Sequence, residues 1–357
     1  MSTTVRTVWL VATALAAVSF AGDAADLSRA PGSSEADAKT TALERAYLSN
    51  REAFREFSCR FVVKRGRAFT TEDALAGKLS DVVVRNGLWV VDGARQRYEL
   101  ICEDPKSEIL VPPSAGLAKD NRLVYTSVKC LSETFICDDV VGLTYAPKHL
   151  VANIGTSLGA EPRITVTPLS YGIMGVNETS GPIFSSTVGS DVFRRYGGVK
   201  EVAGARLEAL LVGKSSSFYK EFSLDAKRGF LPVEVRYYSR DGVLAGLAVV
   251  TKIRKCPNNA YFPERSVTLV NPDAPGPKQV WVIELRDLTL TRPAEEELAI
   301  ELVEGTEIVE PPTMLARVRL SKTQTVGVKD LGQLLDRCRD ARRAELQRRI
   351  GANRDEQ

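Results

Sequence analysis

The chain has 357 residues, of which 44% are hydrophobic and 26% charged, and this composition excludes a largely disordered protein. A net charge of +3 is too small for a dedicated nucleic-acid binder. With one histidine, His149, and no Cys-x-x-Cys spacing, no zinc site can be recognised. Glycine loops of the P-loop or dinucleotide type are missing too, so we predict neither a metal nor another cofactor.

The first residues have the layout of a secretory signal peptide. One positive charge, Arg6, precedes an apolar run from Val8 to about Ala21, and small residues follow. A membrane anchor is the alternative, but it needs about 20 apolar residues and this run is shorter. We expect residues 1–24 to be removed, by cleavage after Ala24 or Ala21, and no cysteine stands there to take a lipid. The mature protein is then expected to be soluble, in the periplasm or outside the cell.

Residues 25–38 are small and polar, with Pro and Gly, and predict a flexible leader. From Lys39 to Phe57 the apolar residues partly follow the 3.6-residue period, which predicts an amphipathic helix. Short β-branched and aromatic runs follow it, and Asn86-Gly87 and Asp92-Gly93 predict hairpin turns between them. These runs cover residues 59–66, 81–93 and 95–103.

The middle of the chain, residues 138–190, has a weaker pattern. Residues 138–159 predict one or two short helices, and a glycine-interrupted loop or short strand follows. From Gly198 the strand pattern returns and predicts an antiparallel meander, because no long helical segment separates the strands. The expected strands are residues 202–212, 215–225, 231–239, 244–253 and 279–290.

Alternation along two of these strands separates an apolar face from a polar one. In the first, Val233, Val235 and Tyr237 alternate with Glu234 and Arg236. In the second, the alternating residues are Trp281, Ile283 and Leu285 on one side, with Val282, Glu284 and Arg286 on the other. A sheet with one apolar and one largely wet face is typical of a sheet curled around something.

The end of the chain predicts a basic amphipathic helix within residues 321–357. From Lys329 onward, leucines fall near one helical face among several arginines. Such a helix could touch anionic lipid or a partner. A helix packed on the sheet with a solvated basic face is favoured, because Asp336, Asp340 and Glu345 dilute the charge.

Six cysteines in an exported chain allow up to three disulfides. Cys130 and Cys137 lie close enough in sequence to bridge a hairpin or loop, and this is the pairing that we predict. The alternative is that several of the six are small buried thiols.

The sharpest enzymatic signal is GTSLG, residues 155–159, in which Ser157 would be a nucleophile. That motif requires a later histidine, whereas His149 precedes the serine. A lysine base would be needed instead, so a serine hydrolase is the least favoured function, and we do not predict an enzyme.

Several motifs along the chain together resemble the bacterial periplasmic lipoprotein carriers, the LolA-like outer-membrane lipoprotein-sorting superfamily. One is a Gly-x-Leu-Trp-Val strand that leads to Arg-x-Arg, with Gly87, Trp89, Arg95 and Arg97. The others are a strand ending in Asp225, then Gly229, Leu231 and Pro232, then Asp241-Gly242, and finally Phe262-Pro263.

The resemblance implies a mainly β, α+β fold over residues 39–320, with 138–190 as an insertion: an incomplete antiparallel β-barrel, or half-barrel, with helices packed as a lid. It further implies a carrier that holds a lipid, an acyl chain or a lipidated protein, without covalent chemistry. A non-catalytic scaffold in envelope assembly, contacting an envelope protein, is the alternative. The candidate ligand-cavity residues are Trp89, Val233, Val235, Tyr237, Leu247, Val249, Trp281, Ile283 and Leu285.

Overall fold

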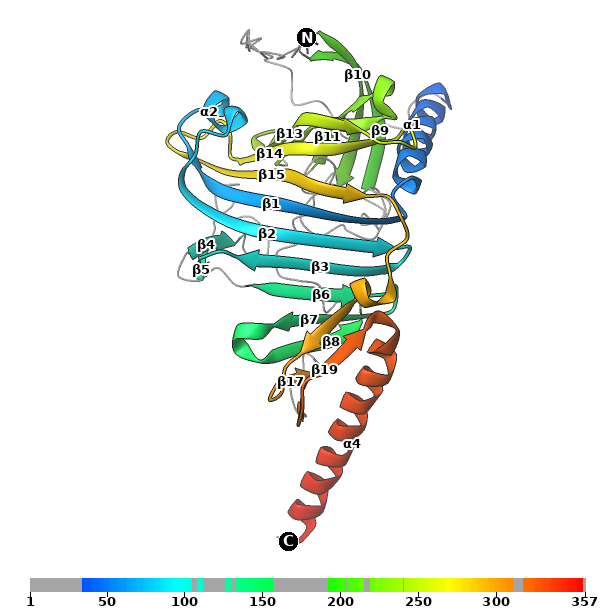
Figure 1. Cartoon of the computed structure of the whole chain (residues 1–357). Coiled ribbons are helices and arrows are strands. Elements are labelled where there is room, and N and C mark those ends of the chain that lie inside the picture. Colours follow the sequence, from blue (N-terminus) through cyan, green and yellow to red (C-terminus); the bar gives the residue numbers. More distant parts are fainter. Residues whose placement is uncertain are drawn as a thin grey trace, which may run out of the picture.

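The computed structural model describes residues 34–104, 108–111, 126–129, 132–156, 192–202, 204–214, 219–239, 241–310 and 317–355. Over these residues the chain forms one large curved sheet that does not close into a barrel (Figure 1). Its strand order is β18-β17-β8-β7-β6-β3-β2-β1-β15-β14-β13-β12-β11-β10-β9. Its pairs are antiparallel except β17 with β8, which is parallel. The predicted mainly β fold class, an incomplete antiparallel barrel, is confirmed.

The sheet has two arms that meet at β1, Glu56–Ala68. One arm consists of β2 Ser80–Asp92, β3 Arg95–Cys102, β6 Glu133–Cys137, β7 Val141–Ala146, β8 Val151–Thr156, β17 Glu307–Val309 and β18 Arg317–Arg319. The other consists of β15 Lys278–Thr289, β14 Tyr261–Val270, β13 Leu244–Lys255, β12 Leu231–Tyr238, β11 Tyr219–Asp225, β10 Ala205–Lys214 and β9 Val192–Val202. The second arm is the meander that the sequence predicts, because its neighbours in space are also neighbours in the chain.

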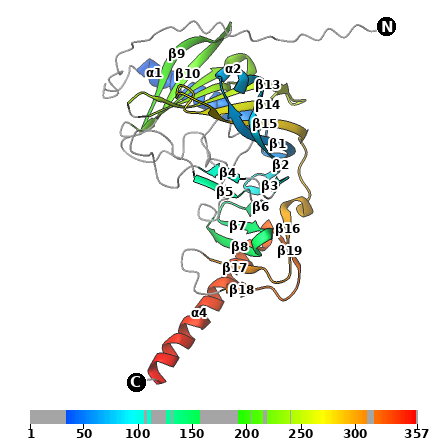
Figure 2. The ribbon, with the colours of Figure 1, turned by 90° about the vertical axis from the view of Figure 1, so that its left-hand side faces the viewer.

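Two small sheets and three helices complete the described fold. The small sheets pair β4 Glu108–Val111 with β5 Thr126–Lys129, and β16 Ala299–Leu302 with β19 Gln324–Gly327. The helices are α1 Ser34–Glu52, α2 Thr71–Ala76 and α4 Leu331–Asp355. Short 3-10 turns are η1 Pro147–His149, η2 Ala226–Arg228, η3 Glu295–Leu298 and η4 Val328–Asp330. Seen from the side, α4 projects from the end of the sheet that holds β17 and β18 (Figure 2). Among the described residues, no helix is long and apolar enough to cross a bilayer.

The turn predicted at Asp92-Gly93 is confirmed, and the Asp241-Gly242 motif also forms a turn. Gly93 closes the β2–β3 hairpin with φ 61°, and Gly242 closes the β12–β13 hairpin with φ 74°, which is backbone that glycine adopts without strain. The turn predicted at Asn86-Gly87 is wrong, since β2 runs through both residues. Gly87 lies opposite Phe61 of β1, and its missing side chain leaves room for that ring.

Other boundaries differ from the sequence-based expectation. Helix α1 begins at Ser34, inside the predicted leader, and ends at Glu52, before the predicted Phe57. The predicted short helices at 138–159 are wrong where the structure describes them, because β7 and β8 form a hairpin there. In β7, Leu143 and the residues flanking it are buried on both faces, and a strand covered on both sides lacks the alternation that would identify it.

Separate apolar clusters pack on the two faces of the sheet. Helix α2 covers one side of β14 and β15, over residues such as Val267 and Val282. Helix α4 covers β7 and β8 with Leu331, Leu334 and Leu335, so its first turns are packed on the sheet as predicted. Arg97 of the Arg-x-Arg motif connects β3 with β16, because its guanidinium group donates to the carbonyl oxygen of Ala299 at 2.6 Å. Most of the remaining sheet face belongs to the largest cluster.

Candidate ligand-binding face

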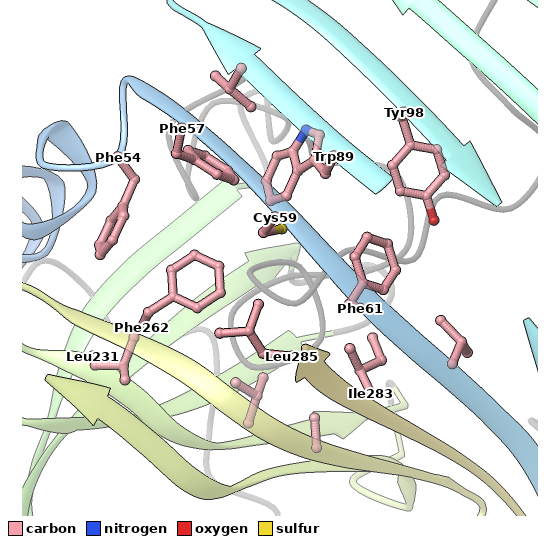
Figure 3. Packing of buried hydrophobic residues seen from close by; sticks show 14 of the residues in the cluster. Phe54, Phe57, Cys59, Phe61, Trp89, Tyr98, Leu231, Phe262, Ile283 and Leu285 are labelled. Carbon is pink, nitrogen blue, oxygen red and sulfur yellow. The ribbon is translucent and has the colours of Figure 1, made fainter. Parts of the chain in front are cut away.

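The largest cluster lies on the side of the sheet against which α1 packs, and we call it the apolar face. It extends from β6, through β1 and β15, to β10, and Figure 3 shows part of it. Its buried members are Leu43, Phe54, Phe57, Cys59, Phe61, Val63, Trp89, Val91, Tyr98, Leu100, Phe135, Cys137, Leu210, Val212, Phe222, Leu224, Leu231, Val235, Ala248, Cys256, Ala260, Phe262, Val270, Trp281, Ile283 and Leu285.

Strand alternation builds this face. Phe57, Cys59, Phe61 and Val63 are every second residue of β1, so they all point to the same side. Register then sets their neighbours on β2, where Trp89 stands opposite Cys59. The result is a row of side chains from neighbouring strands, which is the arrangement that one continuous apolar surface requires.

Aromatic rings hold the part of the apolar face next to the end of α1. Phe57 packs edge-on against Trp89, with ring centroids 4.9 Å apart, and Phe54 meets Phe262 at 5.2 Å (Figure 3). The indole nitrogen of Trp89 donates to the Gln96 side-chain oxygen at 3.2 Å, so its polar atom is satisfied inside the apolar surroundings.

Five of the nine predicted cavity residues belong to the apolar face: Trp89, Val235, Trp281, Ile283 and Leu285. Tyr237 packs at its margin, whereas Val233 lies at a bulge of β12, where alternation does not assign its side. Leu247 and Val249 do not belong there. Their register partners on β12 are Arg236 and Glu234, so they lie on the opposite face, and Leu247 packs on the α2 cluster.

Sequence reasoning missed several members of the apolar face. They are Phe57, Phe61, Tyr98, Phe135, Phe222 and Phe262. Alternation was available as a signal in β1, where Phe57, Cys59, Phe61 and Val63 follow a period of two. The others lie on strands whose hairpin partners had to be known before a side of the sheet could be assigned.

Two sets of polar contacts fasten α1 to the sheet. Near its start, Lys39 contacts Glu208 of β10 at 3.2 Å, and the Tyr196 hydroxyl of β9 donates to the same carboxylate at 2.5 Å. Near its end, Asn50 accepts from the backbone nitrogen of Tyr261 at 3.2 Å and donates to its carbonyl oxygen at 3.4 Å.

The pKa values of Tyr196 and Glu208 reflect this arrangement. Burial opposes the charged form of Glu208, but the hydrogen bonds from Tyr196 and Lys39 outweigh it and lower the pKa of the carboxyl group. Burial, together with the hydrogen bond to Glu208, raises the pKa of Tyr196 to about 12. At neutral pH the tyrosine is therefore a donor and the glutamate an acceptor.

An open pocket of about 820 Å³ lies beside the apolar face, between the end of α1 and the end of β15. We call it the rim pocket. Leu288 and Leu290 line it and also pack against the apolar face, whereas Glu56 and Asp92 supply charge. The rim pocket thus joins the apolar surface to a polar opening.

The described residues include His149, and they hold no cluster of metal ligands. His149 is exposed on η1, and across the described ranges no three His, Cys, Asp or Glu side chains gather as metal ligands. Ser157 lies outside the described residues.

The predicted Cys130–Cys137 disulfide is wrong. Cys137 is a buried thiol, whereas Cys102, the last residue of β3, is disulfide-bonded. The side chain of Cys137 is part of the apolar face, on the same side of β6 as Phe135, which explains its burial. Cys130 lies outside the described residues.

No protein-family model and no curated protein sequence matches the chain. Solved structures with a similar course of the chain include a DUF1329 family protein from Desulfovibrio piger, at 10% identity and a TM-score of 0.43, covering 70% of this chain and 92% of that one. A putative outer membrane lipoprotein-sorting protein domain from Vibrio parahaemolyticus has 11% identity and a TM-score of 0.43, covering 71% and 92%. The Pseudomonas aeruginosa MucA/MucB complex has 12% identity and a TM-score of 0.25, covering 71% and 100%.

Since these TM-scores are below 0.5, the function of this chain is inferred from its own residues.

Proposed function

We propose that the protein is an exported carrier that binds one acyl chain, of a lipid or a lipidated protein, non-covalently against the apolar face. The observation that supports this most is the continuity of that face from β6 to β10, next to the open rim pocket. At about 0.8 kcal/mol per buried methylene, a long acyl chain supplies on the order of 10 kcal/mol before costs, so apolar contact suffices.

Binding requires the face to be uncovered, because its residues are buried in the structure. Helix α1 is the element that we propose to move. Its polar attachments include the contacts of Lys39 and Asn50, which a shift of the helix can break without unfolding the sheet. Such rearrangements over an apolar site are a common way to admit a ligand.

The periplasm or the extracellular space is the proposed location, because residues 1–24 have the layout of a signal peptide. N-terminal sequencing of the protein purified from its host should give a start after Ala24 or Ala21. A start at Met1 would contradict export by this signal.

Native mass spectrometry and displacement of a fluorescent fatty acid test the carrier function. Ala248 lies on the apolar face and is 1% exposed, so Ala248→Phe fills space there and should weaken fatty-acid binding by at least about tenfold. Val249→Phe is the matched control, because it changes the next residue on the opposite face. A clean apo mass with no displacement by any fatty acid would count against the carrier.

A non-catalytic envelope scaffold is the second candidate, and the burial of Val235 at 0% and Ile283 at 1% exposure favours it. In a scaffold the apolar face is simply the core that holds α1 on the sheet. The same measurements separate the two functions, since a scaffold gives the apo mass and does not respond to fatty acid. An envelope protein would then be its partner, detectable by crosslinking in whole cells.

A further inference from the structure

Helix α4 has a packed half and a half that projects from the sheet (Figures 1 and 2). Cys338 is buried, whereas none of residues 339–350 with a described side chain is. The helix continues to Asp355, so about 25 Å of it, at about 1.5 Å per residue, lies beyond the packed part. We call residues 339–355 the projecting half. Because helices in proteins gain most of their stability from packing, a further surface would stabilise this half.

An apolar pair of side chains lies exposed on the projecting half. Leu346 is 37% and Ile350 is 58% exposed, and residues four apart share one face of a helix. Arg342 and Arg343 precede Leu346 by four and three residues, so they border the pair on that face. Apolar side chains with arginines beside them are typical of a helix that lies in the interface of a membrane, because long arginine side chains keep their charged ends at the head groups.

The charge of the projecting half complements an anionic surface. From Arg339 to Asp355 the sequence has six arginines and three acidic residues, which leaves a surplus of +3. The whole chain has a net charge of +3, so the rest of it is balanced. Ion pairs such as Arg343 with Asp340 leave the surplus unchanged, because both partners are counted. The net positive charge of the protein is therefore concentrated on the half of α4 that projects.

An anionic membrane fits these residues better than a second copy of the helix. Two copies would bring arginines against arginines, and like charges at close range repel each other. A membrane offers lipid phosphates to the arginines and, directly below them, acyl chains to Leu346 and Ile350. Both features of the projecting half, its charge and its apolar pair, are thus matched by one partner.

We propose that the projecting half of α4 docks reversibly on an anionic phospholipid surface, with Leu346 and Ile350 inserted between the head groups and the arginines beside the lipid phosphates. This inference goes beyond the proposed carrier function. Docking needs neither a bound acyl chain nor an uncovered apolar face, because α4 makes the contact on its own.

Co-sedimentation of the protein, purified from its host, with phospholipid vesicles tests this docking surface. Vesicles of phosphatidylcholine with about one third phosphatidylglycerol should bind the protein at least about tenfold more tightly than vesicles of phosphatidylcholine alone. Added salt should weaken binding to the anionic vesicles, because it screens the arginines. Equal binding to both kinds of vesicle, or binding to neither, would overturn the proposal. A protein crosslinked at position 346 in whole cells, without vesicle binding, would assign the projecting half to a protein partner instead.

Variants of the projecting half locate the contact. Each arginine near an anionic surface strengthens binding roughly fivefold, so Arg342→Gln/Arg343→Gln should weaken binding to the anionic vesicles by at least about tenfold. The matched control is Arg60→Gln/Arg286→Gln, which removes the same charge from two exposed residues of the sheet and should bind within about twofold of the native protein. If the control weakens binding as much, the charge of the whole protein is responsible and the proposal is wrong.

The apolar pair is tested without a change of charge. Leu346→Gln/Ile350→Gln should weaken binding to the anionic vesicles by at least about fivefold, because less apolar surface enters the membrane. Native affinity of this variant would contradict insertion of the pair. These assays contain no fatty acid, so a protein that binds vesicles but no fatty acid would refute the carrier and support the docking surface, and the reverse result would do the opposite.

Discussion

The substitution Gly87→Ala should destabilise the protein because a ring lies across the glycine. A Cβ atom added at Gly87 would stand 2.3 Å from two carbons of the Phe61 ring and 2.7 Å from a third. The ring has little freedom to move away, since Phe61 is 1% exposed and packs against Tyr98 at a centroid distance of 6.1 Å. The added methyl group must therefore displace the ring, the strand or both.

The magnitude follows from two opposing effects. Overpacking a filled core costs about 1–3 kcal/mol, whereas replacing glycine by alanine within a strand gains about 0.5–1 kcal/mol from the unfolded chain. We expect Gly87→Ala to lower the free energy of unfolding by about 0.5–2 kcal/mol in urea titrations at constant slope. The control is Gly155→Ala in β8, where nothing lies within 4 Å of the new Cβ and the stability should stay level or rise.

A double-mutant cycle with Phe61→Ala isolates the clash. Removing the ring alone should cost about 3–5 kcal/mol, because a large buried side chain is lost. In that background the methyl group at Gly87 no longer meets a ring, so adding it should be neutral or stabilising. If Gly87→Ala costs the same with and without the ring, or is as harmless as Gly155→Ala, the ring of Phe61 does not lie across Gly87.

Further predictions concern the attachment of α1, the thiols and α4. The lowered pKa of Glu208 means that its contribution to stability is complete above its unfolded-state pKa and is lost as the pH falls through the lower, folded-state value. Glu208→Gln should therefore reduce the loss of stability between pH 7 and pH 3 in urea titrations, and an unchanged pH profile would refute this role. Burial raises the pKa of Cys338 to about 11, so mass spectrometry should find it alkylated by iodoacetamide only after unfolding, while Cys102 also needs a reductant. Leu335→Ala, at a residue buried against the sheet, should cost about 2–4 kcal/mol, whereas Leu346→Ala, at a residue 37% exposed, should cost less than about 1 kcal/mol; equal melting temperatures would show that α4 does not pack as described.

The sequence predicts the meander well because its strands carry one-sided patterns. In β15, Trp281, Ile283 and Leu285 point to the apolar face and Val282 to the α2 side, as alternation implies. Asp241-Gly242 ends β12 because the turn needs the positive φ that glycine supplies at little cost. In these strands the local sequence pattern and the tertiary packing favour the same structure, so the sequence alone predicts it.

The prediction fails where both sides of a strand are apolar. In β13 the run from Leu244 to Val250 has no polar position, so alternation cannot say which of Leu247 and Ala248 faces α1. Register settles the question: Ala248 stands opposite Val235, and Leu247 stands opposite Arg236. A one-residue error in such a strand moves every side chain to the other face, and this is why Leu247 and Val249 were placed wrongly.

Small residues on the apolar face lie beneath larger ones. Gly87 sits under the ring of Phe61, Gly246 lies 3.2 Å from the ring of Tyr237, measured from where its Cβ would be, and Ala248 pairs with Val235. Close approach between neighbouring strands requires a small residue wherever a ring lies flat across the sheet, so the shape of the face depends on residues that contribute almost no apolar area. These positions carry no large hydrophobic side chain that would identify them in the sequence. Gly87 even follows an asparagine, a pair that is typical of a hairpin turn. The same reasoning predicts that Ala248→Phe overpacks the closed apolar face, so its effect on fatty-acid binding has to be compared with its free energy of unfolding, and Val249→Phe supplies the comparison on the opposite face.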